Sequence, residues 1–131
     1  YFYQKKYDKA LTTFKRTKAI YRKKPEPSIG MGWCYFALRS YERAIEQFEY
    51  AKKFDGDYYQ INKGEGFAQL LMNRKLEAKD NFSKIYNPSQ IKIIFELWAN
   101  WREKDGDELI FFKANDKTPS DPESNVPVNN T

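Results

Sequence analysis

Apolar residues recur at three- and four-residue steps over much of the first hundred positions, which is the spacing of one buried helix face. Two neighbouring segments show this most clearly, and both are bounded by polar or turn-forming residues. In the first segment, which opens at Glu26-Pro27-Ser28, the apolar positions are Ile29, Trp33, Phe36 and Ala37. In the second they are Tyr41, Ala44, Ile45, Phe48 and Ala51. The pattern predicts two helices with a short turn at Arg39-Ser40, and a left-handed cap at Gly56 after the second.

The apolar pattern repeats along the chain at a fixed period, which is the separation of Ala10 from Ala44 and of Ala44 from Ala78. Small residues and aromatic residues both follow this repeat register, and a match of residue type at several independent positions is the mark of an internal repeat. The aligned sets are Ala10, Ala44 and Ala78; Phe14, Phe48 and Phe82; Gly30 and Gly64; Gly32 and Gly66; Trp33, Phe67 and Trp101; and Phe2, Phe36 and Leu70. A small residue lets two helix backbones approach closely, and an aromatic ring one turn away fills the groove between them.

The best copy of this pattern resembles the tetratricopeptide repeat. Gly32 and Tyr35 lie in its first helix, and the second helix reads Tyr-x-x-Ala-x-x-x-Phe-x-x-Ala from Tyr41. The third copy departs from the family pattern, with Gln69, Lys75 and Ile85 where Tyr, Tyr and Ala are usual. The resemblance covers residues 1–88. The first copy is truncated to a second helix from Tyr7 to about Tyr21, preceded by the end of a first helix.

The resemblance implies an all-α fold, a tetratricopeptide-like α-solenoid of stacked antiparallel helix pairs. Each pair needs a neighbour to bury both of its faces, so about three pairs are required for stability. The register fades after Pro88, and residues 89–114 are interpreted as a degenerate fourth repeat or capping helices, the last of them over 108–114. Residues 115–131 hold three prolines and no aromatic residue, which predicts a disordered polar tail.

The composition argues against catalysis. The chain has one cysteine, Cys34, and no histidine, so it lacks the commonest metal ligand and the commonest general base. We therefore expect no enzymatic activity, no metal site and no cofactor. No apolar run is long enough to span a membrane, and a soluble, cytoplasmic protein is favoured. The chain has no initiator Met, so we expect a fragment of a longer array, and the compartment stays unassigned.

The resemblance also implies a binding surface. In tetratricopeptide arrays the first helix of each pair lines a concave groove that holds an extended peptide or a helix of a partner protein. The corresponding candidates here are Phe2, Tyr3, Ile29, Trp33, Phe36, Lys63, Phe67, Leu70 and Trp101. The alternative is that these aromatic side chains pack between helices. A clamp for a carboxylate, found in some family members, is not expected, because Ile29, Trp33 and Phe67 occupy positions where it needs Lys and Asn.

The Gly-x-Gly pairs Gly30/Gly32 and Gly64/Gly66 are superficially like a dinucleotide-binding loop. That loop follows a strand in a βαβ unit, which the helical pattern does not provide. Because the two pairs occupy the same place in successive copies of the repeat, close helix packing is the better interpretation.

Positive charge is concentrated in residues 1–24, which hold nine Lys/Arg and one acid, Asp8, although the net charge of the whole chain is only +5. An acidic partner, a nucleic acid or a membrane surface fits this cluster, as does a solvated helix face or a contact with acidic repeats upstream. Our main hypothesis is a protein–protein interaction scaffold in a multi-protein assembly. A basic nucleic-acid-binding helical repeat is less favoured because the charge is local, and a non-catalytic arm of a larger enzyme is the third alternative.

Overall fold

A computed structural model describes residues 2–103 of the chain, and every regular element within that range is a helix. The first of two units, up to Ile85, contains α1 (Phe2–Ile20), α2 (Glu26–Ala37), α3 (Tyr41–Lys52), α4 (Tyr58–Leu71) and α5 (Lys75–Phe82). The second unit begins at Tyr86 and contains α6 (Pro88–Trp101). The all-helical class predicted from the sequence is therefore confirmed for the described residues. The predicted final helix over 108–114 and the tail over 115–131 lie outside them.

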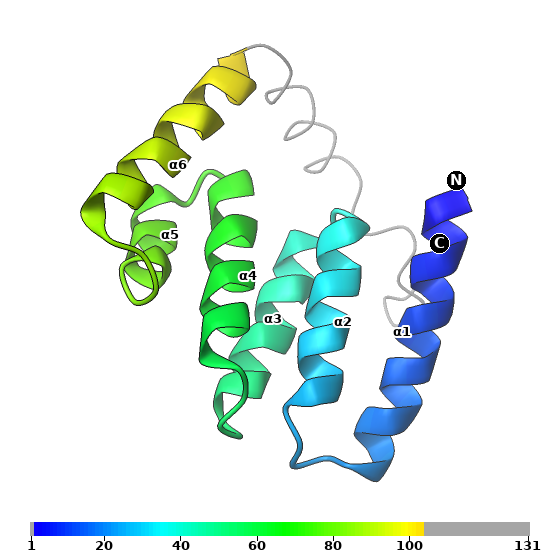
Figure 1. The fold of residues 1–131 in the computed structure, drawn as a ribbon. Coiled ribbons are helices and arrows are strands. Elements are labelled where there is room, and N and C mark those ends of the chain that lie inside the picture. Colours follow the sequence, from blue (N-terminus) through cyan, green and yellow to red (C-terminus); the bar gives the residue numbers. More distant parts are fainter. Residues whose placement is uncertain (1, 104–131) are drawn as a thin grey trace. The chain divides into compact units, whose positions relative to one another are not determined.

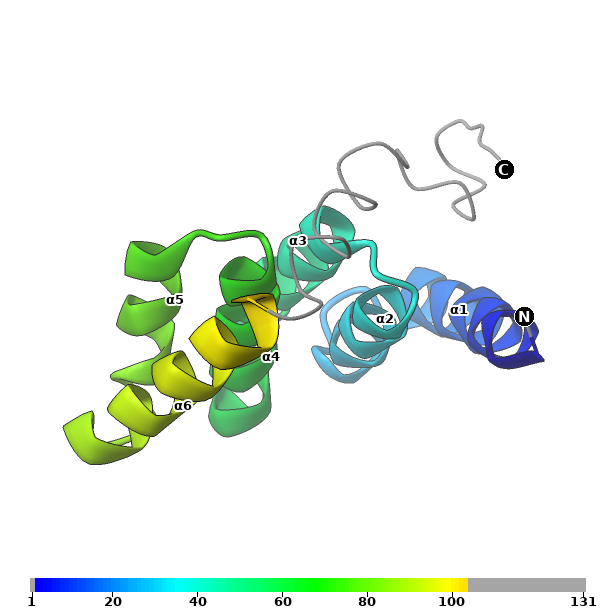
Figure 2. The same ribbon diagram turned by 90° about the horizontal axis from the view of Figure 1, so that it is seen from above.

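The five helices of the first unit pack in chain order, each against the next. Successive helices run in opposite directions, and α2 also contacts α4, which is two helices further along (Figure 1). Two views together place α2 and α4 on one face of this unit, with α3 and α5 on the other (Figure 2). The helix pair predicted on either side of Arg39-Ser40 is present as α2 and α3, and α3 buries all five of the expected apolar residues: Tyr41, Ala44, Ile45, Phe48 and Ala51.

Local sequence sets where the helices begin. Pro27 occupies the first turn of α2, where its missing N–H costs no helical hydrogen bond. Asp57 caps α4, and its carboxylate accepts a hydrogen bond of 3.1 Å from the backbone N–H of Gln60. In the second unit, Asn87 and Gln90 form a reciprocal capping box at the start of α6.

The turns after α2 and α4 have the same geometry and lie one repeat apart. Arg39 and Asn73 both adopt left-handed backbone conformations, with φ of 65° and 63°. In the first turn the N–H of Ser40 donates to the carbonyl of Tyr35, and in the second the N–H of Arg74 donates to that of Gln69, both at 2.8 Å. These six-to-one bonds satisfy carbonyls at the helix ends, as in a Schellman motif.

The turn after α3 corrects one prediction. The left-handed residue there is Asp55, with φ of 55°, and Gly56 has no positive φ. Aspartate tolerates this conformation because its short polar side chain bonds locally. Gly56 is required for a different reason: a Cβ atom there would lie 2.7 Å from Cβ of Pro25 and 3.0 Å from Cδ1 of Ile61.

The core of the first unit is built by phenylalanine rings lying against glycine backbones. A Cβ atom at Gly32 would lie 2.7 Å from the Phe48 ring, and one at Gly66 would lie 2.6 Å from the Phe82 ring. Each of these two contacts joins the helices of one pair, and the second is the repeat equivalent of the first. A second set joins neighbouring pairs: Phe14 contacts Gly30, and Phe48 contacts Gly64. The interpretation of both Gly-x-Gly pairs as helix-packing positions is therefore confirmed.

The structure also corrects the first copy of the repeat. We expected a helix boundary just before Tyr7, with Phe2 and Tyr3 at the end of a preceding helix. Instead α1 continues without a break from Phe2 to Ile20. No Gly or Pro occurs in residues 1–20 to end a helix there, so local propensity lets it extend.

Candidate interaction surface

The face formed by α2 and α4 carries aromatic side chains that pack against rings on α3 and α5. The ring of Trp33 on α2 meets Phe48 of α3 edge-on, with centroids 5.4 Å apart. The ring of Phe67 on α4 meets Phe82 of α5 in the same manner at 4.9 Å. Both rings are half-buried, so each combines a packed edge with a surface that solvent reaches. Packing and partial exposure therefore coexist in these residues, and the two sequence interpretations do not exclude each other.

Further side chains extend this surface along both helices. Phe36 is half-buried and packs edge-on against Trp33 at 5.5 Å and against Tyr41 at 5.4 Å. Ile29 is also half-buried and lies at the edge of the core cluster. On α4 the ammonium group of Lys63 lies 5.6 Å from the centroid of the Tyr59 ring, a cation–π arrangement.

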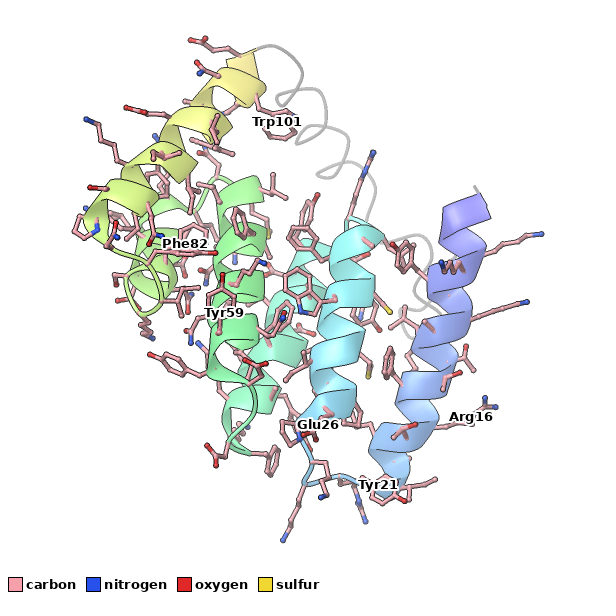
Figure 3. The ribbon with its side chains drawn as sticks, in the orientation of Figure 1. Arg16, Tyr21, Glu26, Tyr59, Phe82 and Trp101 are labelled. Atoms are coloured by element: carbon pink, nitrogen blue, oxygen red, sulfur yellow. The ribbon has the colours of Figure 1, made fainter. Side chains whose placement is uncertain are left out.

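Tyr59 was missed by the sequence interpretation although it is an exposed aromatic side chain on the same helix as Lys63 and Phe67. It is 45% exposed and lies on the viewer's side of α4 in Figure 3. No aromatic partner in the repeat register marks this position, because the equivalent residue is Pro25, which is buried. The available signal was its spacing: Tyr59, Lys63 and Phe67 follow one another at four-residue steps on one helix face.

One predicted surface residue is buried, and three others lie on α1 or α6. Leu70 is only 2% exposed, so it belongs to the core and is removed from the candidate surface. It lies on the first helix of its pair, as expected, but helix spacing alone does not distinguish an inner-facing from a core-facing residue. Trp101 lies on α6 in the second unit, whereas Trp33 and Phe67 lie on α2 and α4 in the first. Phe2 and Tyr3 lie on α1, the same continuous helix as Tyr7.

Polar contacts connect α1, α3 and α5 at equivalent positions. The ammonium group of Lys18 on α1 donates to Oε1 of Gln47 on α3 at 3.0 Å. The ammonium group of Lys52 on α3 donates to Oδ1 of Asn81 on α5 at 3.4 Å. The two donors are equivalent in the repeat register, and so are the two acceptors. The second helices of successive pairs are therefore joined by matching lysine–amide contacts.

A buried carboxylate lies beside the second of these contacts. Glu65 on α4 is 2% exposed, and its Oε1 atom is 2.6 Å from Nζ of Lys52. Its other oxygen accepts a hydrogen bond of 3.4 Å from Gln69, whose own Oε1 accepts one of 2.8 Å from Asn81. Burial, reinforced by the nearby Glu49 carboxylate, raises the pKa of Glu65 to about 7, although the Lys52 ion pair acts in the opposite direction.

Glu65 occupies a position in the repeat register that is also buried in the preceding helix pair. Glu65 is the equivalent of Met31, and Gln69 is the equivalent of Tyr35, both of which are buried apolar residues in the preceding pair. The third copy thus replaces an apolar pair with a hydrogen-bonded polar pair at the same place. Sequence reasoning noted the departure at Gln69 but overlooked Glu65, whose register position already predicted burial.

The described part of the chain offers neither a metal-ligand cluster nor an exposed thiol. Within residues 2–103, no three side chains among His, Cys, Asp and Glu are grouped so as to hold a metal ion. Cys34 is buried with a free thiol, and burial raises its pKa, which disfavours the reactive thiolate.

A pocket of about 250 Å³ is lined by Lys52, Asp55, Gly56, Tyr58, Ile61, Asn62 and Lys84. Over residues 2–103, no helix combines the length and the apolar character that crossing a membrane requires.

Comparison with protein-family models, with curated protein sequences and with solved structures yielded no match to this chain.

Proposed function

We propose that this protein is an interaction scaffold that binds a peptide or a helix of a partner protein on the face formed by α2 and α4. The observation that carries the proposal is the arrangement of Trp33 and Phe67. Each ring is held edge-on by the phenylalanine of its own helix pair and is still partly exposed. Pre-positioned aromatic side chains are effective anchors because they bury a large area and lose few rotamers on binding.

A tetratricopeptide-like array of stacked helix pairs is the architecture that we propose for this scaffold. Three kinds of contact recur in the repeat register and support it: ring against glycine, lysine against amide, and the left-handed turn. An array of this kind presents the first helices of successive pairs side by side. The contact between α2 and α4 is consistent with that arrangement.

The Tyr59–Lys63 pair suggests the character of the partner segment. Lys63 places one positive charge beside the apolar surface, and an apolar peptide with a single acidic residue would complement it. The proposed face is otherwise aromatic and aliphatic, which favours hydrophobic anchors from the partner over a highly charged chain such as a nucleic acid.

The proposal is tested with peptides selected from a random library against the folded, full-length chain. We expect Trp33→Ala and Phe67→Ala to weaken the selected peptides by at least about tenfold, the effect of losing an anchor residue. Because both rings also pack internally, Tyr59→Ser provides a variant at an exposed position, and Tyr58→Ser on the same helix is its matched control. Unchanged peptide affinity in Tyr59→Ser and in both alanine variants, with circular dichroism showing intact folding, would remove the proposal.

A further inference from the structure

The end of α1 and the turn that follows it expose apolar side chains among positive charges. Ile20 is 72% exposed and Tyr21 is 55% exposed, although both are large hydrophobic residues. Arg22, Lys23 and Lys24 follow directly, and all three are exposed. Figure 3 shows Tyr21 at the end of α1 and Arg16 directed away from the neighbouring helices. Single exposed hydrophobic residues are common, but an adjacent pair followed directly by three exposed cations needs an explanation.

The charges on the chain segment that carries this pair have one sign, and the nearest acids along the sequence are Asp8 and Glu26. Residues 9–24 contain seven Lys/Arg and no Asp or Glu. Lys18 is directed inward, where its ammonium group contacts Gln47 and lies 3.9 Å from the Tyr50 ring centroid. Lys15 is half-buried. The exposed cations that remain are Lys9, Arg16, Arg22, Lys23 and Lys24.

The backbone that carries these side chains is held in place. The hydroxyl of Tyr50 on α3 donates a hydrogen bond of 3.1 Å to the carbonyl of Arg22, and the N–H of Lys24 donates to the carbonyl of Tyr21 at 3.1 Å. Pro25, which ends the turn, is buried. The exposed side chains are therefore presented on an ordered turn, and a partner surface need not supply the free energy to order it.

We propose that Ile20, Tyr21 and the surrounding cations dock this protein on the surface of an anionic lipid bilayer. An aliphatic side chain at the tip inserts below the headgroups, and a tyrosine ring favours the membrane–water interface. Arg16, Arg22, Lys23 and Lys24 attract the negative surface potential of such a membrane. Neither contribution alone gives stable binding, and this turn supplies both.

The exposed isoleucine decides between a membrane and the other anionic partners. A nucleic acid would contact the cations and stack on Tyr21, but its phosphates and bases would gain little from Ile20. An acidic protein surface would require a matching apolar depression beside its carboxylates. A bilayer uses all of these side chains without a specific shape, and this docking is independent of the binding face on α2 and α4.

The test is co-sedimentation of the full-length chain with vesicles of phosphatidylcholine containing about 30% phosphatidylserine, at about 0.1 M salt. The double variant Ile20→Ser/Tyr21→Ser is expected to reduce the partition coefficient, obtained from the bound fraction at several lipid concentrations, by about tenfold. Replacing Arg22, Lys23 and Lys24 with Gln is expected to reduce this coefficient by about a hundredfold, since each cation contributes about fivefold. Matched controls on α5 are Leu76→Ser, at a side chain that is 85% exposed, and Lys75→Gln/Lys79→Gln, which should both bind as the unmodified chain does.

Three outcomes would overturn the inference. The first is no binding to the anionic vesicles above that to phosphatidylcholine alone. The second is binding that the Ile20→Ser/Tyr21→Ser variant retains in full, because the attraction would then be purely electrostatic. The third is tighter binding to a mixed-sequence single-stranded RNA in the same buffer, abolished by the same three Gln replacements, which would assign the surface to nucleic acid.

Discussion

The ring of Phe48 occupies the space that a side chain at position 64 would need, so that Gly64 and Phe48 form one packing unit. Gly64→Ala would force a Cβ atom into this ring, and both residues lie in the fully packed interior of the first unit. Overpacking of this kind costs about 1–3 kcal/mol, which exceeds the gain of up to about 1 kcal/mol from the helix propensity of alanine. We expect Gly64→Ala to lower the free energy of unfolding in urea by about 1–2 kcal/mol.

A double-mutant cycle separates this contact from a general effect on α4. Phe48→Leu leaves more room beside position 64, so Gly64→Ala should cost less in that background. We expect a favourable coupling of about 1 kcal/mol between the two substitutions. Strictly additive free energies would show that the ring is not what excludes a side chain at position 64.

The left-handed turns yield a prediction in the stabilising direction. Arg39 carries a β-carbon in a conformation that glycine adopts without strain. Arg39→Gly should therefore stabilise the chain by about 0.5–1 kcal/mol. Asn73→Gly should gain less, because asparagine tolerates this conformation better. Lys53→Gly is the control: its φ of −71° is helical, and the same replacement there should destabilise. Thermal melting of the three variants decides the order, and destabilisation by Arg39→Gly would contradict the turn geometry.

The buried carboxylate of Glu65 predicts how stability changes with pH. Burial raises its pKa from 4.5 to about 7 in the folded chain, so between these pH values the folded state binds more protons than the unfolded state. The stability that protonation provides is present below pH 4.5 and is lost as pH rises through about 7. The loss is on the order of 3 kcal/mol.

Glu65→Gln keeps a similar shape and removes the titration. We expect this variant to be more stable than the unmodified chain at about pH 8 and to show a flatter dependence on pH. Glu46→Gln, at an exposed position on α3, is the matched control and should leave the dependence unchanged. Urea unfolding at several pH values provides the comparison, and a Glu65→Gln profile with the original slope would contradict the assignment.

Ala44 tests the tight contact between helices within a pair. It is fully buried on α3, so Ala44→Glu would place a carboxylate in the interior without a partner. We expect loss of the folded state, or destabilisation of more than about 4 kcal/mol. Ala19→Glu, at an exposed alanine on α1, should change stability by no more than about 0.5 kcal/mol. A normal melting curve for Ala44→Glu would contradict the packing described here.

Much of the helical core was predictable because its residue types repeat. Gly32 and Gly66 are aligned in the repeat register, as are Phe48 and Phe82, and their contacts recur with the same spacing. The residue with a positive φ in the turn after α3 was not predictable. The geometry that closes this turn, and not the presence of a glycine, determines which residue adopts the left-handed conformation. The burial of Leu70 and the exposure of Tyr59 also depend on how helices are rotated against each other, which apolar spacing defines only coarsely.

The most direct measurement of the proposed scaffold function is a map of backbone amide chemical shifts on titration with a selected peptide. We predict the largest shifts on α2 and α4, near Ile29, Trp33, Tyr59 and Phe67, with small changes on the outward side of α3 and α5. Shifts confined to α3 and α5, or to the basic end of α1, would show that the face of α2 and α4 is not the binding surface.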